Sequence, residues 1–156
     1  MESLSNVVGI NRRSVFNLEE ARALLPIVFR LTKSYSERVQ ALIHKLDQAS
    51  LSTSSEGQDS ILADALEAEA GRLIQEWQAK IQKLGGVPKG LWLADFDSGD
   101  GYYCWKYPER NIEYWHAYRD GYSKRVRLSS VEFRASIEVQ DHQRGAGTHS
   151  QLDGRL

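Results

Sequence analysis

The sequence predicts an α+β protein in which a long antiparallel helical hairpin packs on a small antiparallel β-sheet. Over two long segments, apolar residues recur at three- and four-residue steps, which is the pattern of amphipathic helices. The pattern then changes to short aromatic and aliphatic runs separated by turn residues, as in the strands of β-hairpins. Helices and strands in separate blocks of the chain are typical of the α+β class.

The first helical segment begins at Asn17. Its side-chain oxygen can accept a hydrogen bond from a free amide of the first turn, and Glu20 is placed to complete a capping box. Pro26 removes one backbone donor inside the segment, so we expect a kink or a slightly later effective start. The apolar stripe continues for about thirty residues and consists of Ala21, Leu24, Leu25, Val28, Leu31, Tyr35, Val39, Leu42, Ile43 and Leu46.

The second helical segment follows residues 50–60, which are small and polar and which we interpret as a mobile connector. Its stripe has nearly heptad spacing, which favours side-by-side packing of two helices at a shallow angle. Gly85-Gly86 ends the helix, so we expect the hairpin to cover residues 17–84. The stripe consists of Leu62, Leu66, Ala70, Leu73, Trp77, Ile81 and Leu84.

Residues 88–128 form the predicted β region. The first two strands, 91–96 and 102–107, are separated by the five turn residues 97–101. Residues 112–118 fit a strand or one to two helical turns, and residues 123–128 indicate a further strand. We therefore expect one domain over residues 1–134. Residues 135–156 are polar and are predicted to be a disordered tail.

Two pairings of the first two strands are compatible with the sequence. If Phe96 pairs with Tyr102, Ala94 lies opposite Cys104 and Asp95 points to the other face. If Asp95 pairs with Tyr102, Asp95 shares a face with Cys104 as a diagonal neighbour. The sequence leaves this choice open.

Bulk properties exclude several classes of protein. The formal net charge is −1, and residues 89–134 hold eight Lys or Arg against seven Asp or Glu, so we expect no nucleic-acid partner. One cysteine excludes an internal disulfide and a multi-cysteine zinc site. The N-terminus lacks signal-peptide features, and no apolar run approaches the roughly 18 residues of a membrane span. We expect a cytoplasmic protein without membrane contact.

Aromatic residues are concentrated in one part of the chain. Ten of the fifteen lie between Trp92 and Tyr122, around the only cysteine, Cys104, and one of four histidines, His116. One aromatic side chain already buries roughly 150–250 Å², so this segment either covers a larger apolar surface or lines a pocket. Aromatic side chains with a few convergent polar groups are the usual lining of ligand pockets.

The leading functional prediction is a small-ligand-binding module with an aromatic-lined pocket around Cys104 and His116, for an anionic or aromatic ligand. Arg125 could clamp an anion, or it could pair with Glu109, Glu113 or Asp95 in a structural network. The sequence does not identify a cofactor. The predicted ligand-binding residues are Trp105 and Trp115 as walls, Arg125 and His116 as recognition groups, and Asp95 or Glu109 as orienting groups.

Two alternatives remain beside this prediction. Cys104 and His116 are candidate catalytic residues of a thiol-dependent or metal-dependent enzyme, although lone cysteines are usually buried small hydrophobes. We predict no metal site, because the right residue types lack tight metal-ligand spacing. The heptad-like stripes also permit a scaffold role in which the hairpin forms a homo-oligomer. The residue types weighed as metal ligands are Asp95, Cys104, Glu109, Glu113 and His116.

Residues 16–26, Phe-Asn-Leu-Glu-Glu-Ala-Arg-Ala-Leu-Leu-Pro, resemble the opening of a bacterial family catalogued as domain of unknown function 2203. The resemblance covers roughly residues 16 to 128 and implies a cytosolic protein with a helical hairpin and a small β region. It implies no activity. The later residues that resemble the family are Gly90-Leu91, Asp95-Phe96, Cys104-Trp105, Glu109, Trp115-His116, Gly121-Tyr122 and Arg125.

Overall fold

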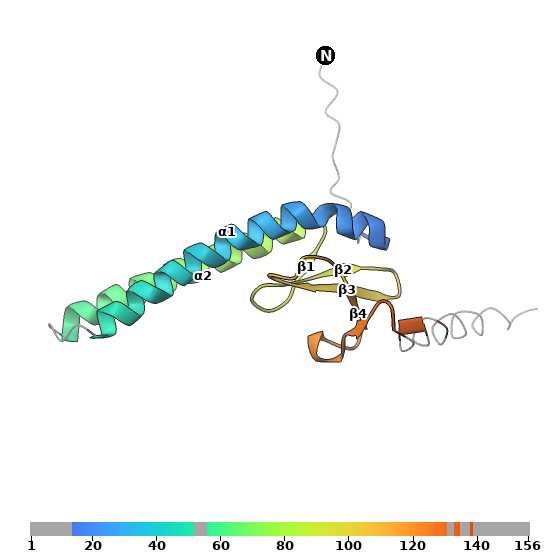
Figure 1. Ribbon diagram of the computed structural model, residues 1–156. Coiled ribbons are helices and arrows are strands. Elements are labelled where there is room, and N and C mark those ends of the chain that lie inside the picture. Colours follow the sequence, from blue (N-terminus) through green and yellow to red (C-terminus); the bar gives the residue numbers. More distant parts are fainter. Residues whose placement is uncertain (1–13, 52–55, 131–132, 135–137, 139–156) are drawn as a thin grey trace, which may run out of the picture.

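The computed structural model describes residues 14–51, 56–130, 133–134 and 138, and Figure 1 shows their arrangement. Two long helices are followed by a five-stranded antiparallel sheet, which confirms the predicted α+β class. The predicted tail, 135–156, lies outside the described residues except for Glu138. The elements are α1 (Leu18–Leu51), α2 (Glu56–Lys83), β1 (Val87–Pro88), β2 (Leu93–Asp97), β3 (Gly101–Lys106), β4 (Tyr114–Ala117), the 3₁₀ helix η1 (Tyr122–Lys124) and β5 (Val126–Arg127).

The ends of the two helices have the predicted signals. The Glu20 amide donates to Asn17 Oδ1 at 2.8 Å, and the Asn17 amide donates to Glu20 Oε1 at 3.1 Å, so the capping box is formed. Gly85 has a φ of 91° after the last turn of α2. The Gly86 amide donates to the Ile81 carbonyl at 3.0 Å and the Gly85 amide to Gln82 at 2.9 Å, as in a Schellman motif.

The hairpin and the sheet share one core at the end of the hairpin next to the sheet. Trp77 of α2 is fully buried, and its indole N–H donates to Thr32 Oγ1 of α1 at 3.0 Å. The helices extend beyond the sheet in Figure 1, and we call residues 40–51 and 56–66 the distal arm. The buried apolar residues of the helices are Ala21, Leu25, Val28, Tyr35, Val39, Leu73, Trp77 and Ile81.

The sheet is a simple meander with strand order β1-β2-β3-β4-β5. Neither of the two pairings that the sequence left open occurs, because Asp95 lies directly opposite Cys104 and Asp97 opposite Tyr102. The turn is therefore three residues long, two fewer than expected, with Gly99 at a φ of 87°. Residues 114–117 form a strand, and only Val126–Arg127 of the last predicted strand pair with it.

The face of the sheet that packs on the helices, which we call the inner face, carries large rings. Phe96 contacts Phe16 with ring centroids 5.6 Å apart, and Trp105 contacts Phe29 of α1 at 6.3 Å. Ala94 lies opposite Trp105, and Tyr103 lies opposite both Phe96 and Trp115, so these residues share this face. The aromatic side chains of the inner face thus cover the apolar side of the helical hairpin and complete one core.

Gly101 allows β3 and β4 to approach closely. A Cβ atom at this position would collide with the His116 carbonyl oxygen and the Trp115 ring. Both are parts of β4, so the strand itself would have to move. We expect Gly101→Ala to lower the free energy of unfolding by about 1–3 kcal/mol, as overpacking does, measured by urea denaturation.

Gly90→Ala is the matched control, since a Cβ there has no heavy atom within 4 Å. It should change the free energy of unfolding by about 0.5 kcal/mol or less. Equal stability of the two variants would contradict the close approach of β3 and β4.

Candidate functional site

Three neighbouring strands bring Asp95, Cys104 and His116 together on the sheet face that points away from the helices, the outer face. Asp95 of β2 lies directly opposite Cys104 of β3, and Tyr102 lies opposite His116 of β4, so all three side chains project from one face. Cys104 is consequently a diagonal neighbour of His116. The three side chains are only 0–2% exposed, although none of them is on the inner face.

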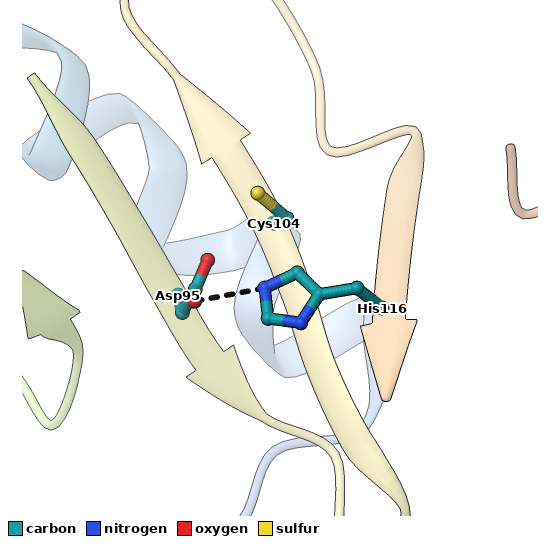
Figure 2. Close-up of side chains that lie close together, drawn as sticks. All are labelled: Asp95, Cys104 and His116. Atoms are coloured by element: carbon teal, nitrogen blue, oxygen red, sulfur yellow. Dashed lines mark hydrogen bonds and ion pairs between the residues drawn. The ribbon is translucent and has the colours of Figure 1, made fainter. Parts of the chain in front are cut away.

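His116 is held at both ring nitrogens. Nδ1 lies 2.9 Å from the Ala117 carbonyl oxygen and Nε2 lies 2.9 Å from Asp95 Oδ2. A carbonyl oxygen only accepts, so Nδ1 carries a proton and donates it. One further proton lies between Nε2 and Oδ2, because two lone pairs would repel each other at this distance. Figure 2 shows the imidazole aimed at the carboxylate, with the Cys104 sulfur beside them.

One of the two carboxylate oxygens of Asp95 is left without a hydrogen bond by the described residues. Oδ1 is buried and has no hydrogen-bond partner among the described residues. Such a group costs about 1–3 kcal/mol, and more when charged. One carboxylate oxygen, Cys104 Sγ and one ring nitrogen of His116 all lie within 4.8 Å of one another. The Asp95 carboxylate is therefore part of a compact group of three donor side chains.

The pKa values of His116 and of the Cys104 thiol are both raised, but a raised pKa favours the charged form only in His116. Burial alone lowers the pKa of His116, but hydrogen bonds to Asp95 and Ala117 and the charge of Asp95 outweigh it and raise the pKa above 6.5. Burial, followed by the charge of Asp95, raises the pKa of the Cys104 thiol well above its usual range, although Arg125 opposes this. These effects favour the protonated form of His116 and keep Cys104 a neutral thiol.

Arg125 and Glu109 form an ion pair, which is one of the three pairings considered for Arg125. The guanidinium donates to Glu109 Oε1 at 2.5 Å and to Oε2 at 3.1 Å. It also stacks on the rings of Tyr114 and Tyr122, with its central carbon 3.9 and 4.2 Å from the ring centroids. The Glu109 carbonyl accepts from the indole of Trp105 at 2.8 Å, which connects this pair to the inner face.

The expected walls of the pocket, Trp105 and Trp115, do not line the same face as Cys104 and His116. Residues adjacent along a strand point to opposite faces, and both tryptophans are on the inner face with exposures of 0% and 2%. Trp115 donates its indole N–H to Ser98 Oγ at 3.0 Å and packs on Phe133. These rings complete the core. Glu113, weighed as a metal ligand, is exposed and lies outside the three-donor group.

Tyrosines and cations surround the three-donor group, and among them only Arg125 was a predicted ligand-binding residue. Tyr102 and Tyr114 project from the outer face because they pair with His116 and Cys104. Cations lie over the tyrosine rings at 3.9–5.6 Å from their centroids, a range typical of cation–π contacts. We call this set the tyrosine–cation rim: Tyr102, Tyr114, Tyr122, Lys89, Lys106, Arg125 and Arg127.

Comparisons with known proteins identify a family without a described activity. The family described as "Uncharacterized conserved protein (DUF2203)" matches residues 14–128. No curated protein and no solved structure matches the chain. Within the parts of the chain that the structure describes, no helix is both long and apolar enough to cross a membrane.

The contact between Asp95 and His116 predicts how stability varies with pH in metal-free buffer. The pKa of His116 is higher in the folded protein than in the unfolded chain. The contact therefore contributes its full share to the free energy of unfolding below about pH 6.5, the pKa of histidine in the unfolded chain. This contribution is lost as the pH rises through the pKa of His116 in the folded protein. Urea denaturation between pH 5.5 and 8.5 should show this decline in the wild type and a smaller one in His116→Gln.

His44→Gln serves as the control, because the His44 side chain is exposed on α1. It should keep the wild-type dependence on pH. If His116→Gln shows the same decline as the wild type, the Asp95–His116 contact does not stabilise the protonated imidazole.

Proposed function

This chain belongs to the family of uncharacterised conserved proteins DUF2203, and we propose that it is a small-ligand-binding module whose site is the outer face of the sheet around Cys104 and His116. The observation that carries the proposal is a polar group of three side chains, buried on a face that neither long helix covers, inside the tyrosine–cation rim. Sheet residues of a soluble protein that point away from the core are normally solvated. A polar centre with aromatic edges is instead a common arrangement in ligand sites.

The rim favours an anionic ligand with an aromatic ring. Among the residues that the structure describes, Lys89, Lys106 and Arg127 form no ion pair, so three positive charges on one face are not neutralised. Each of them lies over a tyrosine ring, at 5.6, 4.9 and 5.3 Å from its centroid. A ligand that combines negative charge with a planar ring would satisfy both features.

The thiol-dependent alternative lacks the features that activate a cysteine. A nucleophilic thiolate needs some exposure and a lowered pKa. Cys104 is 0% exposed, and burial and the charge of Asp95 raise its pKa. The proposed role of Cys104 is therefore in binding.

Phenyl phosphate, with phenol as the uncharged analogue, tests the proposal on metal-free protein. We expect phenyl phosphate to raise the melting temperature and to titrate as one site, and phenol to have a much smaller effect. The double variant Lys106→Gln/Arg127→Gln should bind roughly tenfold more weakly, as expected for the loss of two exposed charge contacts of about 0.7 kcal/mol each.

Lys83→Gln is the control for charge, because Lys83 is an exposed cation at the end of α2. Its affinity for phenyl phosphate should equal that of the wild type. If neither phenyl phosphate nor inorganic phosphate binds, or if the three proteins bind equally, the rim is not a ligand site.

A second candidate function, a homo-oligomeric scaffold, rests on the distal arm. Two helices alone cannot enclose their apolar stripes, and bundles of four helices solve this problem. A second copy of this chain, with its arm packed on the first, would cover these residues. The exposed large apolar residues of the arm are Ile43 (42%), Leu51 (82%), Ile61 (72%) and Leu62 (47%).

Light scattering during size-exclusion chromatography tests this second candidate. We expect a dimer for the wild type at micromolar concentration and a monomer for Ile61→Glu, because a charge would be buried in the interface. Ile27→Glu, which changes an exposed residue (46%) near the sheet, should remain a dimer. A monomeric wild type at all concentrations would exclude association through the arm.

A further inference from the structure

We infer that Asp95, Cys104 and His116 bind one divalent transition-metal ion, with zinc as the best match to their donor atoms. The inference takes its location from the site proposed above and does not depend on a small organic ligand. The sequence predicted no metal site because these residues lie nine and twelve positions apart along the chain. The strand pairing removes that objection, since it places one oxygen, one sulfur and one nitrogen donor within 4.8 Å of one another.

The orientation of His116 is the one that metal-binding histidines have. The ring nitrogen that faces away from the metal usually donates its proton to a carboxylate or a backbone carbonyl, which fixes the tautomer. Here Nδ1 donates to the Ala117 carbonyl at 2.9 Å, so Nε2 is the nitrogen directed at Asp95. Figure 2 shows that this nitrogen and the Asp95 carboxylate point toward each other beside the sulfur.

The carboxylate of Asp95 supplies an independent observation. Only Oδ2 has a partner, whereas Oδ1 is buried without one among the described residues, and the whole side chain is 1% exposed. Buried polar atoms are nearly always satisfied, so each exception requires an explanation. A cation between the carboxylate, the thiol and the imidazole would satisfy it.

Charge distinguishes a metal ligand from a catalytic thiol at this position. A carboxylate directly across the strand pair opposes the formation of a thiolate beside it. A divalent cation reverses this effect, because it attracts both negative groups. Two protons leave to solvent when it binds: the thiol proton of Cys104 and the proton held between His116 Nε2 and Asp95 Oδ2. The neighbouring cation Arg125 is already balanced by Glu109, so a dication with Asp95 and the Cys104 thiolate makes a neutral centre that is suited to burial.

The donor set indicates which ion. Thiolate and imidazole together select zinc and related transition metals, and they disfavour magnesium and calcium, which prefer oxygen. Structural zinc sites usually have four protein donors, whereas three donors leave a position for water or an anion. Asp95, Cys104 and His116 are three, so the ion would retain a position at which a further ligand can bind.

Cobalt(II) and zinc titrations of untagged protein, freed of metal with a chelator, test the inference. Cobalt should bind one ion per chain and produce a near-ultraviolet thiolate-to-cobalt absorption band. Because Cys104 is the only cysteine in the chain, this band reports on one residue, and the histidines elsewhere cannot produce it. Zinc should displace cobalt, abolish the band and raise the melting temperature.

Variants locate the remaining ligands. Asp95→Asn and His116→Gln should weaken cobalt binding about tenfold or more, and Cys104→Ser should remove the band. Glu113→Gln, which changes an exposed acid next to β4, should bind like the wild type. Circular dichroism of each metal-free variant verifies folding, and the band of the wild-type protein remains decisive where a variant does not fold.

Absence of cobalt binding by the wild type, or binding without the thiolate band, would overturn the inference. So would wild-type affinity in folded Asp95→Asn and His116→Gln. The failure of this inference is distinguishable from the failure of the proposed function, since phenyl phosphate is tested on metal-free protein. If the protein binds metal but not phenyl phosphate, only the proposal of an organic ligand is overturned. If it binds phenyl phosphate but not metal, only the metal-site inference is overturned.

Discussion

The pairing of β2 with β3 is the constraint on which the arrangement of this protein depends. Asp95 lies opposite Cys104, and the alternation of side chains then assigns every other residue of the two strands to a face. Phe96, Trp105 and Tyr103 close the core of the helical hairpin, and Asp95, Cys104 and Tyr102 point the other way. A shift of one residue in one strand would place the aspartate among the rings of the core. The apolar face, with Phe96 and Trp105 fully buried, makes such a shift costly.

Local signals in the sequence predicted the helices well. The reciprocal bonds of Asn17 and Glu20 and the glycine pair after α2 depend on residues close together in the chain, so their chemistry could be predicted without the fold. The two stripes likewise predicted the hairpin, because a helical period fixes which residues share a face. The wider assignment to α+β followed from the order of these patterns.

The candidate site was less predictable, because it depends on contacts between strands. Cys104, His116 and Asp95 were named as candidates, but their mutual positions follow from a three-residue turn where five residues were expected. Trp105 and Trp115 were assigned to the site for their size and proximity in sequence, but each is adjacent in its strand to Cys104 or His116 and therefore points to the opposite face. The tyrosines at 102 and 114 could be assigned to the outer face only from the pairing of β3 with β4. Arg125 could have clamped an anion or paired with one of three acidic residues, and its pairing with Glu109 depends on contacts between distant segments of the chain.

The hairpin meets the sheet at one end only, and this has a consequence for how the protein can vary. Among the described residues, the buried residues of α1 end at Val39 and those of α2 begin at Leu73, so no residue of 40–51 or 57–72 is buried. Seven-residue additions or deletions made in both helices would preserve the apolar stripes and leave the sheet undisturbed. The length of the helical hairpin could therefore change over evolution without altering the site on the sheet.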